Sequence, residues 1–232
     1  MSDFVAPPAV LTAETIAWLG AIDSPTVANA IETFKVRDRT EGFIGGYVKP
    51  LFDLGSVMLG HALTVTIGNA PGAPASRAGY WAMWQALEAM PKPAVLVMQD
   101  VSGAPERYAC AGEVMATMAY KLGAVGMVTD GGFRELHEVQ ALGMHYFATM
   151  PVVSHANFEI LDVGIDITVD GQLVKTGDIL HGDVNGIVIV PADVLDGLQA
   201  AIGVIRDREA RFMEFIRSDR FNLADAKAGT GY

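Results

Sequence analysis

The chain has 232 residues, of which 51% are hydrophobic and 25 are glycine, and its formal net charge at pH 7 is −11. This composition is typical of a compact globular protein and excludes a largely disordered one. The acidic balance provides no basic footprint, so neither nucleic acid nor an anionic membrane is expected as a direct partner.

The cysteine content and the N-terminal composition favour a cytoplasmic protein. Cys110 is the sole cysteine, which excludes an intrachain disulfide. The first basic residue is Lys35, so the N-terminal stretch lacks the charged region of a signal peptide. No apolar run approaches the roughly eighteen residues that a membrane-spanning helix needs. We therefore expect a soluble cytoplasmic protein, whose high apolar content fits either subunit interfaces or a well-filled core.

Short β-rich runs alternate with helical patterns along the chain, which predicts an α/β fold. Asp23, Ser24 and Pro25 predict a helix start, because a capping side chain precedes a first-turn proline. Further helices are predicted over residues 112–121 and over a long segment from Pro191. Buried strands are predicted at 57–67, 94–99, 124–129, 145–148, 164–169 and 185–190.

Another helix is expected after Ser76, which is a candidate N-cap. This helix carries a stripe of large apolar side chains, made of Tyr80, Trp81, Trp84 and Leu87. Such a stripe is more typical of a core or an interface than of a ligand-binding box, and we interpret it in that way.

The long C-terminal helix is predicted to have one buried face. Its apolar residues follow a 3-4-3 spacing: Leu195, Leu198, Ile202 and Ile205. The charged run 206–211 is interpreted as the solvated face of the same helix. We expect one domain over residues 1–222 and a C-terminal tail over residues 223–232.

The strongest candidate site is a segment that spaces one arginine and three carboxylates. Glu113 opens a predicted helix, and Arg134 and Glu135 come after the next strand. The turn 130–132 precedes the arginine, and its two glycines permit a positive φ. Glu138 follows three positions after Glu135. An arginine binds a carboxylate or carbonyl through paired hydrogen bonds, and clustered carboxylates hold a divalent cation or a proton-carrying water. The combination indicates chemistry on a keto acid.

Each of these residues also has a purely structural interpretation. Glu113 could complement the dipole at a helix start, and Arg134 with Glu138 could form a surface pair four residues apart. The spacing alone leaves both interpretations open.

Other kinds of site are disfavoured. The five histidines show no HxxxH or HxH spacing, which argues against a histidine-built zinc site, and His137 beside the motif is interpreted as a surface or supporting residue. Cys110 has no paired base and is interpreted as a small buried residue. Lys121 lies at the far end of the predicted helix, so a Schiff-base aldolase is the weaker hypothesis. The glycine-rich loop lacks a Walker lysine and a GxGxxG spacing, which excludes nucleotide binding.

Five motifs between residues 12 and 191 resemble one known family. They are, in order, DSPTVANAIE, GHALTV, AGE, VTDGGFRE and GDVNGIVIVP. Together they make the chain similar to the RraA-like family, which includes 4-hydroxy-4-methyl-2-oxoglutarate/4-carboxy-4-hydroxy-2-oxoadipate aldolases and the regulator of ribonuclease E activity. The resemblance implies a swivelling β/β/α-type single domain with N- and C-terminal helices. It also implies homotrimers or homohexamers whose active sites lie between subunits.

The resemblance implies a class II type lyase that depends on a divalent metal, magnesium or manganese. Such an enzyme cleaves a 4-hydroxy-2-keto acid and releases pyruvate through a metal-stabilised enolate, with oxaloacetate decarboxylation as a side activity. By the same resemblance Arg134 binds the substrate carbonyl. The backbone of a substrate-binding turn receives the carboxylate: Gly112, Glu113, Val114 and Met115. A helix N-terminus suits that role, because its unpaired N–H groups attract an anion.

The resemblance gives Glu135 the position of the metal-binding acid. We further predict that the nearby carboxylates of Glu113 and Glu138 position the water that transfers protons. The sequence departs from the family pattern at Glu135, where the aldolases usually have aspartate, and at Asn185-Gly186, where the family tends to have Asp-Gly. The alternative function is that of a non-catalytic regulator, for which an acidic surface would suit the masking of basic RNA-binding segments.

Overall fold

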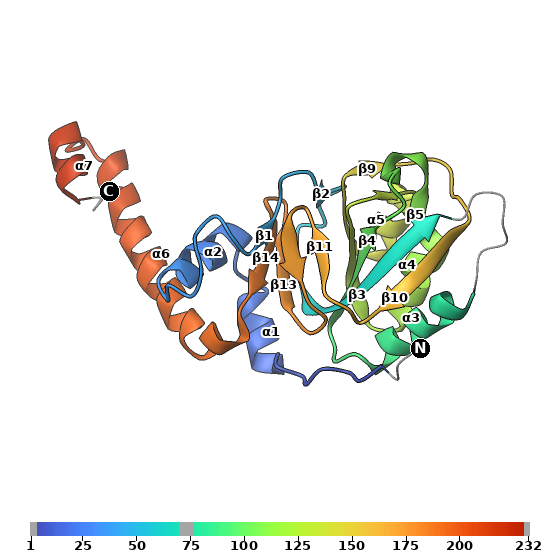
Figure 1. Cartoon of the computed structure of the whole chain (residues 1–232). Coiled ribbons are helices and arrows are strands. Elements are labelled where there is room, and N and C mark those ends of the chain that lie inside the picture. Colours follow the sequence, from blue (N-terminus) through green and yellow to red (C-terminus); the bar gives the residue numbers. More distant parts are fainter. Residues whose placement is uncertain (1–3, 70–76, 230–232) are drawn as a thin grey trace.

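A computed structural model describes residues 4–69 and 77–229. Figure 1 shows a central sheet flanked by two groups of helices, which confirms the expected α/β fold. Ser76, the expected N-cap, lies outside the described residues. Within the described part of the chain, no helix is long and apolar enough to cross a membrane.

The main sheet has nine strands, and its central strands are parallel while its edges are antiparallel. In spatial order they are β1 (Phe43–Ile44), β14 (Gly186–Val190), β13 (Ile179–Asp183), β3 (Met58–Asn69), β4 (Ala94–Asp100), β6 (Ala124–Thr129), β8 (His145–Ala148) and β2 (Lys49–Pro50), with β10 (Phe158–Val163) paired to β3. Two small sheets complete the fold: β11 (Ile167–Val169) with β12 (Gln172–Val174), and β5 (Ala109–Ala111) with β7 (Gly132–Phe133) and β9 (Met150–Pro151).

The four predicted helices are present, and the helices Ala13–Leu19 and Leu136–Leu142 were not predicted. In chain order the helices are α1 (Ala13–Leu19), α2 (Ser24–Glu32), α3 (Ala78–Ala89), α4 (Glu113–Lys121), α5 (Leu136–Leu142), α6 (Leu195–Arg217) and α7 (Leu223–Gly229), with 3-10 turns at Pro105–Arg107 and Ala192–Val194. The start of α2 is as expected, because the Asp23 carboxylate accepts the Thr26 N–H at 2.9 Å.

The central strands bury both of their faces, as parallel strands covered on two sides must. In β4, Leu96 and Met98 point to the core under α3 and α4, while Val95 and Val97 point to a second core under the β11–β12 hairpin. This alternation explains why the strand reads as a continuous apolar run. The parallel pairing of β4 with β6 places the carboxyl ends of these two strands side by side.

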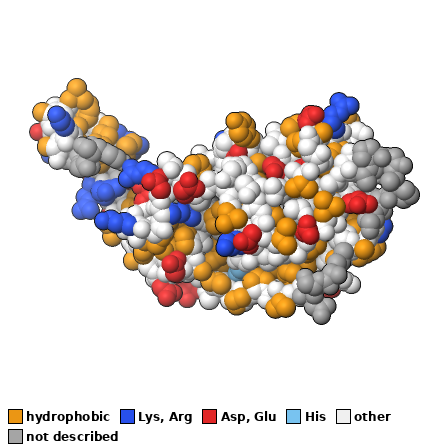
Figure 2. All heavy atoms as spheres, in the orientation of Figure 1, with side chains coloured by type: hydrophobic (Ala, Val, Ile, Leu, Met, Phe, Trp, Pro, Cys, Tyr) orange, Lys and Arg blue, Asp and Glu red, His pale blue; other side chains and the backbone are white. Residues whose placement is uncertain are grey.

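The N-terminal helices and the first half of α6 cover β13 and β14. Leu198, Ile202 and Ile205 are buried there, which confirms the predicted face. Beyond Ile205, α6 extends away from the body, and α7 lies at its end (Figure 1). Figure 2 shows Lys and Arg side chains gathered over this part, and the run 206–211 is solvated as expected, with Phe212 following it.

Two regions differ from the expected strands and tail. The strand predicted at 164–169 is shorter in the structure and covers Ile167–Val169. The strand β10 comes before it and was not predicted, because a bulge between Ile160 and Asp162 interrupts its pairing with β3. Residues 223–229, expected as a tail, form the short helix α7.

Candidate functional site

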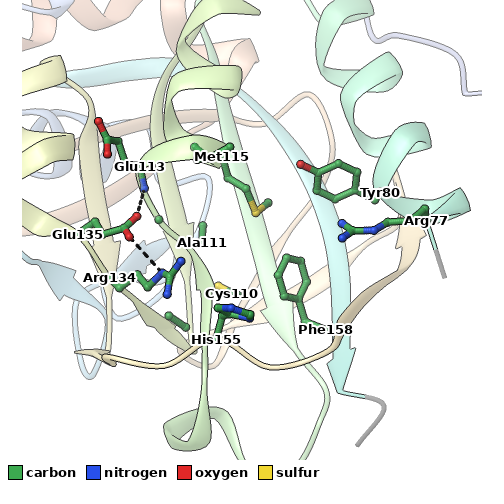
Figure 3. A pocket seen from close by; sticks show the side chains of 13 residues that line it. Arg77, Tyr80, Cys110, Ala111, Glu113, Met115, Arg134, Glu135, His155 and Phe158 are labelled. Carbon is green, nitrogen blue, oxygen red and sulfur yellow. Dashed lines mark hydrogen bonds and ion pairs between the residues drawn. The ribbon is translucent and has the colours of Figure 1, made fainter. Parts of the chain in front are cut away.

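A pocket of about 230 Å³ lies at the N-terminus of α4 (Figure 3). Six of the residues predicted for the site line it: Gly112, Glu113, Val114, Met115, Arg134 and Glu135. The remaining walls are formed by Ala109, Cys110, Ala111 and, across the pocket, by Arg77, Tyr80, His155 and Phe158. Segments that are distant in the sequence therefore meet in one cavity.

Strand pairing brings the two halves of the predicted motif together. β5 runs into Gly112 and α4, and β7 runs into Arg134, and these two strands are parallel neighbours. The Arg134 N–H donates to the Ala111 carbonyl at 3.1 Å, which extends the ladder by one bond. The arginine therefore leaves the sheet beside the start of α4.

The Glu135 carboxylate contacts two groups that line the pocket, the Glu113 backbone and the Arg134 side chain. Its Oε2 accepts the Glu113 backbone N–H at 2.6 Å, and its Oε1 lies 3.6 Å from Arg134 Nε. The carboxylate thus caps α4, where an anion also complements the helix dipole. One of the backbone donors expected to receive the substrate's carboxylate, the Glu113 N–H, therefore already bonds a carboxylate of the chain itself.

The backbone strain lies at Glu135 rather than at the glycine turn. Glu135 has φ 60° and ψ 49°, whereas Gly131 and Gly132 do not have positive φ. Neither glycine of the turn adopts the positive φ that it permits, and Gly132 serves close packing instead, because a Cβ there would overlap Val152. A left-handed non-glycine residue costs about 1–3 kcal/mol and is typical of functional sites.

Gly112 is required by the same arrangement. A Cβ at this position would overlap the Glu135 Oε2 and approach Arg134 at 3.0 Å. The N-cap of α4 therefore has no side chain of its own, and the Glu135 carboxylate takes the capping role.

The other predicted acids are less central. Glu113 lines the pocket, but in Figure 3 its carboxylate points away from the Arg134 guanidinium. Glu138 is exposed on α5 and is not among the lining residues. Asn185 lies in the turn between β13 and β14, where its side chain donates to Asp183, and it does not line this pocket either.

Sequence reasoning missed the wall opposite Arg134. Of its members, Tyr80 belongs to the aromatic stripe interpreted as core or interface; Trp84 and Leu87 are indeed buried, but Tyr80 faces the pocket. His155 lines the pocket, whereas His137 is exposed outside it. The segment before β10 carried no motif, so it gave no signal.

Burial shifts the pKa of two groups at this site, the Cys110 thiol in the pocket wall and the Asp130 carboxyl. It raises the pKa of the Cys110 thiol to about 12, so the thiol stays protonated and is no nucleophile. Burial also raises the pKa of the Asp130 carboxyl to about 6, with the nearby Asp100 carboxylate adding to the effect. Cys110 donates to the Gly132 carbonyl at 3.3 Å, as suits a small buried residue.

Two carboxylates line the pocket, those of Glu113 and Glu135. Within residues 4–69 and 77–229, no three His, Cys, Asp or Glu side chains gather closely enough to hold a metal. Magnesium is commonly bound through one or two carboxylates, with substrate and water oxygens completing its shell. The donors present therefore fit a cation of that loosely held kind, and not a closed structural metal site.

Comparisons with known proteins agree with the motifs. A family model for RraA-like proteins, described as Aldolase/RraA, matches residues 24–189. A protein of Halalkalibacterium halodurans named "Putative 4-hydroxy-4-methyl-2-oxoglutarate aldolase" is 28% identical over 82% of this chain and 87% of its own length.

Two solved structures show the same fold at low identity. RraAS2 of Streptomyces coelicolor, described as an unusual member of the RNase ES inhibitor RraA protein family, has a TM-score of 0.66 at 23% identity, covering 89% of this chain and 98% of that one. An uncharacterized protein from Pseudomonas syringae pv. tomato has a TM-score of 0.69 at 18% identity, covering 95% and 100%. The expected single α/β domain with N- and C-terminal helices is confirmed.

Proposed function

Because the chain belongs to the RraA-like family, we propose that it is a divalent-metal-dependent lyase that cleaves a 4-hydroxy-2-keto acid and releases pyruvate. The family includes both aldolases and regulators of ribonuclease E, so membership alone does not select the activity. The observation that supports catalysis is the grouping of Arg134, Glu135 and the start of α4 around one small pocket.

Arg134 is the residue assigned to the keto acid. Its side chain is about one-third exposed and enters the pocket, and it contacts Glu135 at 3.6 Å through Nε alone. The remaining guanidinium donors are thus available to the keto oxygen and the carboxylate beside it, which a planar fork matches. A fixed positive charge at this position stabilises the negative charge that develops on the keto oxygen.

The reaction breaks the bond between C3 and C4 of the substrate. A base takes the proton of the C4 hydroxyl, the C4–O bond becomes a carbonyl, and the electron pair of the broken bond moves toward C3 and the keto group. A proton delivered to C3 then completes pyruvate. A divalent cation held by Glu135 would supply a Lewis acid at the keto oxygen.

Glu113 is assigned to the proton transfers, through water. Its carboxylate is exposed at the pocket rim and points away from Arg134, so a direct contact with the reacting carbons is not part of the proposal. A carboxylate that orders a water molecule can accept the hydroxyl proton and return one to C3. Glu138 lies outside the pocket and remains a sequence-based expectation.

The test is pyruvate release from 4-hydroxy-2-keto acids and from oxaloacetate, with purified full-length protein. We expect turnover that EDTA abolishes and that magnesium or manganese restores. Glu135→Gln keeps the shape of the side chain, so it should weaken the metal dependence while leaving the fold intact. Activity that survives both EDTA and Glu135→Gln would contradict the metal mechanism. If no keto acid is cleaved with any metal, the regulator becomes the better hypothesis.

A further inference from the structure

A second arginine faces Arg134 across the pocket. In Figure 3 the guanidinium of Arg77 points into the cavity from the α3 side, and that of Arg134 points into it from the opposite side. The two differ in their partners. Arg134 lies beside the Glu135 carboxylate, whereas Arg77 forms no ion pair with a carboxylate of the described residues.

A ring contact and the packing of α3 set the position of Arg77. Its guanidinium carbon lies 5.2 Å from the centre of the Tyr80 ring, a cation–π arrangement. Gly79 lets α3 pack directly on β10, because a Cβ there would overlap the Ile160 carbonyl oxygen. β10 begins at Phe158, which also lines the pocket. Arg77 itself is exposed, and the Tyr80 ring is the contact that orients its guanidinium toward the pocket.

The charges of the pocket leave Arg77 available to a ligand. The Glu135 carboxylate is already shared between Arg134 and the α4 N-terminus, and the Glu113 carboxylate points away from Arg134 at the rim. Between the two arginines lie the side chains of Met115 and Phe158. The cavity thus offers cations at two ends and apolar groups between them, which suits a short molecule with an anionic group at each end.

We propose that Arg77 is the specificity-determining residue of the pocket, binding a second carboxylate at the distal end of the substrate. The inference rests on the proposed function, which assigns the keto-acid end to Arg134. A planar guanidinium fork matches a carboxylate with two hydrogen bonds, and the ring of Tyr80 orients that fork before the substrate arrives.

A pair of substrates that differ at one carbon tests this directly. 4-Hydroxy-2-oxoglutarate has a carboxylate at C5, and 4-hydroxy-2-oxopentanoate has a methyl group there, while the bond to be broken is the same. The preference is the ratio of their kcat/KM values. We expect Arg77→Met to lower this ratio about tenfold or more, mostly through KM of the dicarboxylate, because a charge-assisted hydrogen bond is lost. Arg77→Lys should restore part of it. Arg107→Met removes another exposed arginine outside the pocket and should leave the ratio unchanged.

A binding experiment separates this proposal from the lyase itself. 2-Oxoglutarate and 2-oxopentanoate lack the C4 hydroxyl and cannot undergo the cleavage, and their affinities can be measured by calorimetry. If Arg77→Met weakens 2-oxoglutarate selectively, the assignment of Arg77 holds even where no cleavage is found. If the folded Arg77→Met protein keeps the same preference in both experiments, or loses both ligands equally, Arg77 is not the selecting residue.

Discussion

The two walls of the pocket are built in different ways. In the wall formed by Gly112, Arg134 and Glu135, the Glu135 carboxylate makes a hydrogen bond to the start of α4 and an ion pair with Arg134. The backbone of Glu135 is also strained. The opposite wall, with Arg77 and Tyr80, is aromatic and holds its guanidinium by a ring contact. The first arrangement fixes its side chains through contacts with one another, whereas the second does not depend on those contacts. Under the two proposals above, the first wall carries the chemistry and the second carries the selectivity.

Of the substitutions considered, Arg134→Lys should have the largest effect on the wall formed by Gly112, Arg134 and Glu135. The substitution keeps a positive charge but removes the planar fork, so both the keto oxygen and the contact with Glu135 lose their fixed donors. We expect kcat/KM for the cleaved keto acid to fall about 10²- to 10³-fold, as for the loss of a donor to a developing oxyanion. Steady-state kinetics measure the effect, and an unchanged melting temperature shows that the fold is retained. A change of about twofold or less would make Arg134 a structural residue.

Asp130→Asn tests the loss of folding free energy that results from burying the Asp130 carboxylate near this wall. The folded pKa of Asp130, about 6, lies above its ordinary value of 3.8, so the native state holds a proton more tightly than the unfolded chain does. Stability is therefore lost as pH rises from about 4 through 6, by up to about 3 kcal/mol. Urea unfolding at several pH values should show this loss in the wild type and not in Asp130→Asn, whose amide oxygen can still accept the Asp100 N–H that Asp130 accepts at 2.6 Å. Parallel pH curves for the two proteins would contradict it.

Gly112→Ala should affect the wall that contains Glu135, and not the opposite wall. The added methyl group overlaps the Glu135 carboxylate, so the cap of α4 has to move. We expect a loss of about 1–3 kcal/mol in the free energy of unfolding, together with reduced turnover. Gly203→Ala is the matched control, because this glycine lies within α6 with no atom near the added methyl. It should stabilise the protein by up to about 1 kcal/mol.

The smallest effect is expected on the opposite wall. Tyr80→Leu removes the ring under Arg77 and should weaken dicarboxylate binding by about 0.5–1 kcal/mol, the usual size of an exposed cation–π contact. Tyr80→Phe keeps the ring and should remain close to the wild type. Calorimetry with 2-oxoglutarate measures both. A loss for Tyr80→Phe equal to that for Tyr80→Leu would indicate that the hydroxyl, and not the ring, matters.

The sequence predicts the elements whose signals are local. Asp23 before Ser24-Pro25 marks the start of α2, and the spacing of Leu198, Ile202 and Ile205 marks the buried face of α6, because each signal lies within one helix. The first wall could also be predicted, since its two segments carry motifs.

The opposite wall could not be predicted, because it depends on long-range pairing. Phe158 reaches the pocket through the antiparallel pairing of β10 with β3, in which Phe158 lies opposite Asn69, far away in the sequence. Arg77 joins it because α3 packs on the same strand through Gly79. Neither contact leaves a periodic pattern. The left-handed backbone of Glu135 was missed for a related reason, since two glycines nearby offered a simpler place for such a turn.

The projecting half of α6 affects how the molecule moves through a solvent. Residues 206–217 continue the helix for about 18 Å beyond the buried face. A protein with such an arm has more hydrodynamic drag than a compact body of equal mass. A monomer of 24.6 kDa would therefore elute early from a column calibrated with compact standards and be mistaken for a larger species. The number of subunits has to be measured by light scattering or sedimentation equilibrium, which report mass independently of shape.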